Sequence, residues 1–494
     1  MRALRNLGLA RRAVAMGASS FSSTAALPWR PRVCILGSGW GAFALARELD
    51  RSAFDVTMVS PRNHMVFTPL LASTATGTLD FRSVAEPIHD SFRDVRYCHG
   101  AATGLDVAHR LVTVETSELT PRGCEPTVRT APVPYDVLVI AVGARINTFG
   151  CPGVLQHAHF LKELADARSI RQHLIRNLEA ASFPGVDAGE RARLLSSVIV
   201  GGGPTGIELA AEMHDFLHED LARLFPRVAP EVSITLVEAS SRVLGGFDSS
   251  VRAYAARRFA RDGIRVHTGA AVTRLDPTAA TLSDGTVLPF GLCVWSTGLA
   301  PSPFVTALDP ATFAKDWWGR CLTSYTLKAL SGAADAAPAR HQGAPTAPVF
   351  DDAAGARSLP GVFALGDAAS VGDRGFAATA QVAEQQGLWL GRTLNAALAQ
   401  CRGDRDALWS YVPPEPFRYV HRGAMVLLGR FAGASDFTRG APVAPLYGST
   451  LQGITAWLLW RSAYLTQLGS WRNRVLVPLN WTRTMLFGRD VTQF

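Results

Sequence analysis

Two stretches of the chain pair a short apolar run with a glycine-rich turn and a following helical pattern. The first has apolar residues at 33–36, apolar side chains at helical spacing over 43–49, and a second apolar run at 55–60. Strand and helix patterns that alternate in this way predict a βαβ unit with parallel strands. The turn between the first strand and the helix contains Gly37, Gly39, Gly41 and Ala42.

The second stretch repeats this arrangement farther along the chain. An apolar run at 197–200 leads into Gly201, Gly203 and Gly206, and the next strand covers 233–238. Glycine permits the tight turn and a close approach of the backbone to a phosphate, and the helix N-terminus offers free N–H groups to that anion. One such turn arises easily by chance, whereas two in one chain predict two dinucleotides and electron transfer between them.

The residues that end the second strand of each unit differ. Glu238 stands where a carboxylate would bind the ribose hydroxyls and repel a 2′-phosphate, which favours NADH over NADPH. Arg242 lies four residues later and could soften that preference. The first unit has Ser60 at this position, followed by Arg62, so the motif alone leaves its nucleotide undefined.

Two later segments change the character of the chain. The stretch at 331–348 is rich in Ala, Pro and Gly, lacks periodicity and predicts a surface insertion. Residues 360–366 then predict an apolar strand, and Asp367 follows directly after Gly366. A carboxylate at this strand end could bind a ribityl hydroxyl or shape a phosphate turn.

The first thirty residues predict an organellar transit peptide. They are rich in Arg, Ser and Ala, contain no acidic residue and lack the apolar core of a secretory signal. About half of the net charge of +8 comes from arginines among the first twelve residues, so the charge is weak evidence for a nucleic-acid partner. No apolar run reaches the ~18 residues that span a bilayer.

The cysteines and histidines do not form a recognisable chemical site. The seven cysteines include no C-x-x-C pair, which argues against a disulfide scaffold, a zinc ribbon and a dithiol oxidoreductase. His64, His214 and His421 have no metal-ligand spacing, so we predict no metal site.

The C-terminal segment has an unusual balance of residues. Residues 437–489 contain no Asp or Glu, six arginines and four of the eleven tryptophans. The apolar residues that fall on one helical stripe are Leu451, Ile454, Trp457, Leu458, Leu465 and Leu468. This stripe predicts a helix in the headgroup plane of a membrane, against the alternative of a core or dimer helix. Arg461 falls within the stripe and would have to reach water, a lipid phosphate or an internal acid.

Several longer motifs resemble those of the alternative (type II) NADH dehydrogenases. They lie at 37–42, 60–63, 67–71, 141–143, 147–153, 201–212, 214–216, 294–298, 364–367, 379–387 and 416–419, and in the tail at 460–465, 470–474 and 487–490. The resemblance covers residues 32–490 apart from the insertion. It implies that NADH delivers a hydride to non-covalent FAD, which then reduces ubiquinone at the membrane surface without proton pumping.

The resemblance implies an α/β fold with two Rossmann-like dinucleotide-binding domains of the glutathione-reductase type and a short C-terminal amphipathic membrane-anchoring domain. We expect a transit peptide at 1–27, an FAD-binding domain at 28–155 and 359–415, an NADH-binding domain at 156–325, an insertion at 326–358 and a membrane-association domain at 416–494. The resemblance also implies a homodimer at the mitochondrial inner membrane, and a plastid is the alternative location.

The resemblance assigns most of the expected cofactor contacts. For FAD they are Gly37, Gly39, Gly41, Ala42, Ser60, Arg62, Thr68, Gly143, Gly366, Asp367, Ala380, Gln381 and Val382. For NADH they are Gly201, Gly203, Gly206, Glu238 and Gly298.

Three residues are the expected catalytic groups. Glu208 lies just inside the second glycine-turn helix, where it could face the nicotinamide and flavin and help to move a proton. The alternative for Glu208 is a simple helix-start acid. Gln381 and Gln385 share a helical face, and in the family this segment lines the quinone site, where neutral amides can bind carbonyls. The alternative for both glutamines is a solvent-facing pair.

Two other functions fit parts of the sequence. A sulfide:quinone oxidoreductase shares this architecture and needs cysteines at the flavin, a role in which Cys151 and Cys321 could be cast. Glu238 and the intact second glycine turn argue against it, because sulfide oxidation does not use NADH. A flavoprotein retained for protein interaction is the second alternative, but it would need neither the quinone segment nor the aromatic and basic tail.

Overall fold

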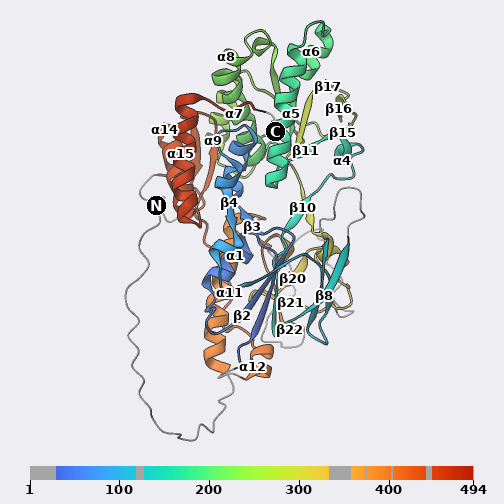
Figure 1. Cartoon of the computed structure of the whole chain (residues 1–494), viewed down its shortest axis with the longest axis vertical. Helices are drawn as coiled ribbons and strands as arrows, with labels where there is room; N and C mark the ends of the chain where they lie inside the picture. Colours follow the sequence, from blue (N-terminus) through green and yellow to red (C-terminus); the bar gives the residue numbers. More distant parts are fainter. Residues whose placement is uncertain are drawn as a thin grey trace, which may run out of the picture.

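The computed structural model describes residues 29–117, 127–332, 358–372, 375–401, 404–440 and 448–492. The expected transit peptide at 1–27 and most of the expected insertion lie outside these residues. Figure 1 shows an elongated molecule with one large sheet near one end, a second α/β layer near the other, and the C-terminal helices along one side.

The first glycine-rich unit belongs to an eight-stranded sheet, in which its two strands lie near one edge. Its strands, in spatial order, are β23 (Ala369–Val371), β20 (Cys321–Thr323), β21 (Lys328–Leu330), β22 (Ser358–Ala364), β9 (Val137–Ile140), β1 (Arg32–Leu36), β2 (Asp55–Ser60) and β5 (Arg96–His99). The strands from β22 to β5 pair in parallel, as the alternating pattern predicts. Strand β1 is buried on both faces, which explains its continuous apolar run.

The second unit forms a separate, fully parallel sheet of five strands. Their order is β11 (His159–Phe160), β18 (Leu292–Trp295), β12 (Ser196–Val200), β13 (Ser233–Glu238) and β14 (Arg265–Thr268). The predicted class of two Rossmann-like sheets is therefore confirmed. Smaller sheets flank them: β3 (His64–Val66) with β4 (Ala85–Pro87), β6 (Ala101–Asp106) to β7 (Leu111–Ser117) to β8 (Val128–Pro134), β10 (Ala144–Ile146) with β19 (Leu299–Pro301), and β15 (Val272–Leu275) to β16 (Ala279–Leu282) to β17 (Val287–Pro289).

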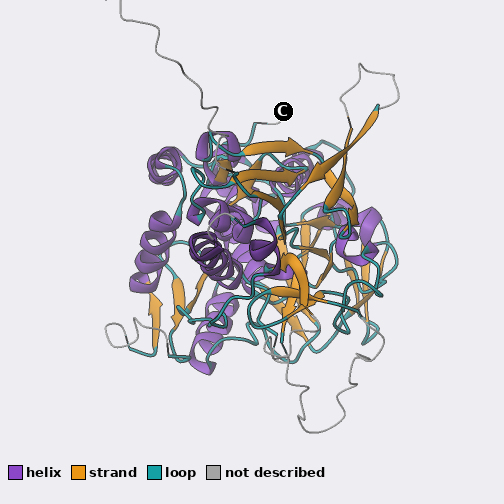
Figure 2. Cartoon of the chain, turned by 90° about the horizontal axis from the view of Figure 1, so that it is seen from below, coloured by secondary structure: helices purple, strands orange, loops and turns teal. Residues whose placement is uncertain are grey.

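Helices cover both sheets. The longer ones are α1 (Trp40–Glu48), α5 (Leu164–Ser182), α7 (Pro204–Phe216), α9 (Ser249–Arg261), α11 (Ala380–Cys401), α14 (Ile454–Gln467) and α15 (Trp471–Phe487). A view from below shows the helices gathered beside the strands (Figure 2). Helix α1 packs closely on α11, where a Cβ on Gly387 would lie 2.3 Å from the carbonyl oxygen of Gly41.

The expected end of the NADH-binding domain and the expected start of the insertion are both wrong, because the strands on either side of residue 325 belong to the first sheet. We expected 156–325 to form the NADH-binding domain and the insertion to begin at 326. Instead β20 pairs with β23, and β21 pairs with β22, so both strands belong to the first sheet. Backbone pairing at the sheet edge outweighs the weak apolar pattern of these short strands.

The C-terminal segment forms a small sheet and two helices. The sheet consists of β24 (Ala424–Leu427), β25 (Gly433–Asp436) and β26 (Thr450–Gly453), and α14 packs on it. No helix among the described residues is long and apolar enough to cross a membrane.

The predicted apolar stripe of α14 is not a single exposed face. Trp457 and Leu468 are buried in the protein, whereas Ile454 and Leu458 are more than half exposed. One side of α14 packs on β25, so some apolar residues of the stripe contact the protein and others face outward. Arg461 lies between the rings of Trp457 and Trp481, at 4.0 and 4.2 Å. The carboxylates of Glu212 and Asp215 also attract its guanidinium, so an internal acid is the expected partner that the structure supplies.

Candidate functional site

A cavity of about 850 Å³ lies between the carboxyl ends of the two sheets. Its lining includes Gly37, Gly39 and Gly41 from the first unit, and Thr205 and Gly298 from the second. Such a position outside the carboxyl ends of parallel strands is where open α/β sheets bind ligands. The volume falls in the usual range for cofactor and ligand sites.

The two glycine turns have the same geometry. Gly37 and Gly201 have φ values of +112° and +115°, which a side chain would strain. A Cβ built on Gly39 or Gly203 would meet nothing within 4 Å, so the backbone is open to a ligand there. A Cβ on Gly206 would lie 2.0 Å from the carbonyl oxygen of Gly201, which keeps this position closely packed. These are the three glycine roles of a pyrophosphate-binding turn.

Most of the residues expected to contact FAD surround the first turn. Those that line the cavity are Gly37, Gly39, Gly41, Ser60, Arg62, Thr68, Gly143, Gly366, Asp367 and Ala380. Ala42 and Val382 are instead buried behind the lining, and Gln381 also lies outside it. Gly143 has φ +67° and open space at its Cβ, so it presents bare backbone to the cavity.

The charges in the cavity are only partly paired. Arg62 donates to Glu163 at 2.6 and 2.7 Å. Lys162 also lines the cavity, and its ammonium makes no hydrogen bond or ion pair with another described residue. Burial lowers the pKa of Lys162 and raises the pKa of Asp367, and each opposes the shift of the other by charge attraction. These two groups can therefore meet the polar parts of a bound cofactor.

Sequence reasoning missed Lys162 and Glu163. The chain has only three lysines among 49 basic residues, and this scarcity is the signal that could have drawn attention to Lys162. Gln386 was also missed as a positioning residue. Its Oε1 atom accepts a hydrogen bond from the backbone N–H of Gly366 at 2.6 Å, which fixes the turn beside Asp367.

The residues at the two strand ends make different contacts. Glu238 accepts hydrogen bonds from the backbone N–H of Gly202 at 2.6 Å and of Ser240 at 2.8 Å. Its carboxylate is therefore held beside the second glycine turn. Ser60 instead contacts Ser38 through their hydroxyl groups, at 2.9 Å.

Glu208 is not placed where we expected it. Its Oε1 atom accepts from the backbone N–H of Leu427 at 3.0 Å and from the Trp460 indole at 3.3 Å, and it does not line the cavity. Both partners come from the C-terminal segment, which covers this face of α7. Burial raises the pKa of Glu208 to about 8.

Gln381 and Gln385 share a face, but their amides are occupied. Gln385 donates to the carbonyl of Val420 and accepts from its N–H, at 2.8 and 3.0 Å. Gln381 donates to the carbonyl of Gly423 at 2.8 Å and accepts from the Tyr419 hydroxyl at 3.3 Å. The solvent-facing alternative is wrong, since both amides bond to the backbone of the C-terminal segment, and the quinone contact stays a prediction. The pair clamps the 419–423 segment onto α11.

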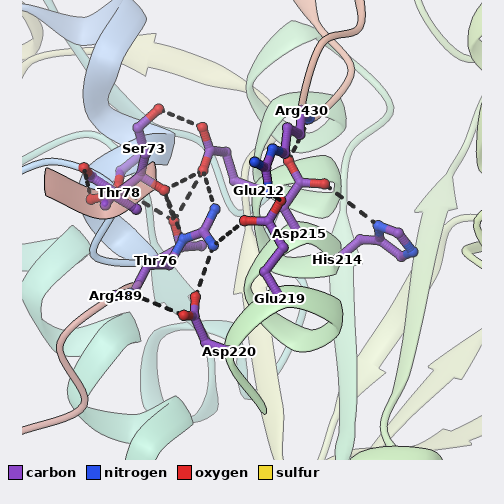
Figure 3. Close-up of polar contacts among 11 residues, drawn as sticks. Ser73, Thr76, Thr78, Glu212, His214, Asp215, Glu219, Asp220, Arg430 and Arg489 are labelled. Carbon is purple, nitrogen blue, oxygen red and sulfur yellow. Dashed lines mark hydrogen bonds and ion pairs between the residues drawn. The ribbon is translucent and has the colours of Figure 1, made fainter. Parts of the chain in front are cut away.

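The end of α7 carries a second polar cluster, which Figure 3 shows. Arg489 donates to Thr78 at 2.9 Å, to Asp220 at 2.9 Å and to Glu219 at 3.0 Å. Glu212 lies 3.8 Å from the same guanidinium. It also accepts hydrogen bonds from three hydroxyls, those of Ser73, Thr76 and Thr78. This junction joins both dinucleotide-binding units to the C-terminal segment, in agreement with a structural role for Glu212.

The two cysteines of the sulfide alternative lie apart. Cys151 packs on the core of the second unit, whereas Cys321 is fully buried in the core of the first. Neither cysteine lines the cavity. No group of three or more potential metal ligands occurs among the described residues.

Comparison with known proteins agrees with this geometry. Residues 31–328 match the family model for pyridine nucleotide-disulphide oxidoreductases, and residues 421–490 match the NDH2 C-terminal domain. The chain is 38% identical to the internal alternative NAD(P)H-ubiquinone oxidoreductase A1 of Solanum tuberosum, over 94% of this chain and 88% of that protein.

Two further comparisons extend this result. The external NADH-ubiquinone oxidoreductase 2 of Saccharomyces cerevisiae is 34% identical, over 93% of this chain and 82% of that protein. The structure of NDH2 from Plasmodium falciparum in complex with NADH superimposes with a TM-score of 0.79 at 21% identity, and covers 94% of this chain and 100% of that one. The last comparison supports the fold.

Proposed function

Because this chain belongs to the type II NADH dehydrogenase (NDH2) family, we propose that it is an FAD-dependent NADH:ubiquinone oxidoreductase that does not pump protons. The observation that carries the proposal is a cavity lined by the first glycine turn and by Thr205, Ser296 and Gly298 of the second unit; Gly201, Gly203, Gly206 and Glu238 lie outside this lining. Hydride transfer requires two ring systems within van der Waals contact, and a shared cavity permits this contact.

The first unit fits FAD held without a covalent bond. Gly39 and Gly143 leave open backbone where a pyrophosphate can approach, and the N-terminus of α1 faces the same space. Asp367 is suited to a ribityl hydroxyl, and Lys162 to the polar edge of the flavin. Bound FAD would accept a hydride from NADH and supply the two electrons that reduce the quinone.

The second unit fits NADH. Gly203 leaves space for the pyrophosphate at the start of α7, and Glu238 is held where it can accept from the adenosine ribose hydroxyls. Thr205, Ser296 and Gly298 line the side of the cavity that belongs to this unit. The protein thereby orients the coenzyme toward the first unit.

Attachment to the membrane would use a face that differs from the predicted stripe. The exposed apolar residues of α14 and α15 are Ile454, Leu458, Trp471, Val475, Leu479, Met485, Leu486 and Phe487. Trp471, Val475 and Leu479 recur at intervals of four, so they share one side of α15. A surface of this kind suits the lipid interface in which a long-tailed quinone resides.

We place the protein at the mitochondrial inner membrane, as a peripheral protein and a homodimer. The relatives from Solanum tuberosum and Saccharomyces cerevisiae carry mitochondrial names, one internal and one external. The basic, acid-free leader supports the same organelle.

Absorbance of the purified flavoprotein without oxygen tests the proposal. Added NADH should bleach the flavin within the mixing time, and a short-tailed ubiquinone should restore its colour. Bleaching by sulfide alone would favour a sulfide:quinone oxidoreductase, although the separation of Cys151 from Cys321 argues against it. If NADH bleaches the flavin and quinone does not restore its colour, the result would favour a flavoprotein retained for protein interaction.

A further inference from the structure

We propose that Phe149 is a positioning residue that covers the nicotinamide half of bound NADH at the mouth of the cavity. This inference rests on the proposed function, because it needs NADH as the coenzyme. It concerns a side chain that belongs to neither glycine turn.

Phe149 is held in an unfavourable conformation. Its φ of +52° lies in the left-handed region, which bulky residues rarely adopt, and the residue is 61% exposed. An exposed aromatic side chain on a strained backbone adds little to the stability of the fold. Strained residues of this kind concentrate at ligand sites.

Several hydrogen bonds impose this conformation. The backbone N–H of Phe149 donates to Oδ1 of Asn147 at 2.8 Å, and the N–H of Asn147 donates to the carbonyl of Gly298 at 3.3 Å. The Trp295 indole donates to the carbonyl of Asn147 at 3.0 Å. The turn is therefore fixed to the end of β18, and its ring cannot relax without breaking these contacts.

The ring of Phe149 lies against a residue that lines the cavity, although Phe149 itself is outside the lining. A Cβ on Gly298 would lie 2.6 Å from two ring carbons of Phe149, so the ring abuts the bare backbone of Gly298. Gly298 lines the cavity, as does its neighbour Leu299, which is 40% exposed. Phe149 and Leu299 together form an apolar edge beside the opening.

The strand order assigns this edge to the nicotinamide half. Glu238 ends β13, on one side of β12, and Gly298 follows β18, on the other side. NADH crosses the end of the central strand, with its adenosine ribose at the acidic residue. Phe149 therefore stands beside the half of NADH that reaches toward the first unit.

A flat apolar ring suits this position for two reasons. It can stack on or against the planar nicotinamide, and it keeps water from the reacting face. An apolar ring neither transfers a proton nor carries electrons, so we expect its main effect on NADH binding rather than on the chemical step.

Three substitutions test the proposal in the holoenzyme with NADH and a short-tailed ubiquinone. Phe149→Gly removes the ring and relieves the strain at positive φ, so the melting temperature should stay within ~2 °C of the wild type. The KM for NADH should rise about three- to tenfold, while kcat and the KM for quinone change less than twofold. Phe149→Leu should raise the KM almost as much, and Phe149→Trp should preserve it. Phe183→Leu is the control, since Phe183 is 71% exposed at the end of α5, where none of residues 178–188 lines the cavity.

The outcomes separate the possible errors. An unchanged KM for NADH in Phe149→Gly would overturn the proposal and leave the proposed function intact. A wild-type KM in Phe149→Leu would show that bulk alone matters and would overturn the stacking role. If NADH does not reduce the wild-type flavin at all, the proposed function fails, and this inference fails with it.

Discussion

The two glycine-rich units share one turn geometry but are attached to the rest of the protein in different ways. In the first unit, α1 packs on α11 through glycines, and Ala44 is buried beside Gly387 of α11. In the second, the position that corresponds to Ala44 is Glu208, and α7 joins the C-terminal segment through Glu208, Glu212 and Asp215. Both helices pack on apolar cores, but the contacts of the second to the C-terminal segment include buried carboxylates, whereas the ion pairs of the first to α11 are partly exposed.

This difference indicates how the two sites divide the work. An apolar, closely packed helix suits a cofactor that stays bound, because nothing around it has to rearrange. Buried polar contacts are directional, so they fix the second unit in one orientation toward the C-terminal segment. The variants below test first which nucleotide each turn holds, and then how each helix is attached.

The largest effect should follow from adding a side chain at the open glycine of each turn. Gly39 and Gly203 have φ values of −78° and −75°, so Gly39→Val and Gly203→Val both fit the backbone, and their side chains meet only a ligand. Gly39→Val should yield protein without flavin. Gly203→Val should stay yellow and need at least ~10-fold more NADH for half-maximal reduction.

Each of these two variants is the control for the other. Flavin content is read from absorbance after gel filtration, and NADH dependence from the rate of bleaching. If Gly203→Val lost its flavin and Gly39→Val kept it, the assignment of FAD to the first unit would be reversed.

The next effect concerns the junction at Arg489. Arg489→Met leaves Glu212 and Asp220 buried without their cation, so we expect a loss of about 3–5 kcal/mol in unfolding free energy. Arg392→Met is the matched control, because Arg392 makes an exposed ion pair with Glu48 in the first unit and should cost at most ~1 kcal/mol. Urea unfolding of both variants measures the difference. Equal losses would show that the two helices are attached with similar strength.

The fold and both turns could be predicted because their signals are local. A strand, a glycine turn and a helix follow one another in the chain. The turn geometry at Gly37 and Gly201 can therefore be predicted from neighbouring residues alone. Asp367 was predicted from the apolar strand that ends at it, whereas Gly298 was predicted only by the resemblance to the family.

The surroundings of the predicted catalytic residues could not be derived in this way. The spacing of Gln381 and Gln385 shows that they share a face, but the segment that occupies their amides begins at residue 419. Glu208 meets Leu427 and Trp460, which lie more than two hundred residues away. Tertiary packing determines which distant segment covers a helix face, and the spacing of side chains along the chain does not predict that segment.

Glu208 gives the second helix a dependence on pH. Its pKa of about 8 exceeds the ordinary value of 4.5, so in this window the folded state holds a proton that the unfolded state has lost. The unfolding free energy should therefore fall with rising pH between these values, by up to about 1.4 kcal/mol per pH unit. Glu208→Gln keeps an oxygen that can accept from Leu427 and cannot titrate, so its melting temperature should fall less steeply between about pH 5 and pH 8. Other titrating groups contribute to both proteins, so parallel curves would contradict the buried, protonated state of Glu208.

The smallest effect concerns the strand ends, where Glu238 and Ser60 differ. Glu238→Gln should raise the KM for NADH about tenfold, because the amide places a donor beside the N–H of Gly202 and weakens acceptance from the ribose. The KM for NADPH should change little, since the loss of the carboxylate also removes its repulsion of the 2′-phosphate. Arg242→Ala is the companion variant, which should weaken NADPH use and leave NADH use unchanged. Glu238 also holds the turn through Gly202 and Ser240, so an equal rise of KM for both coenzymes would show that it only shapes the backbone. If the preference for NADH over NADPH becomes smaller and the flavin content stays unchanged, Glu238 selects the coenzyme of the second unit and does not affect FAD binding.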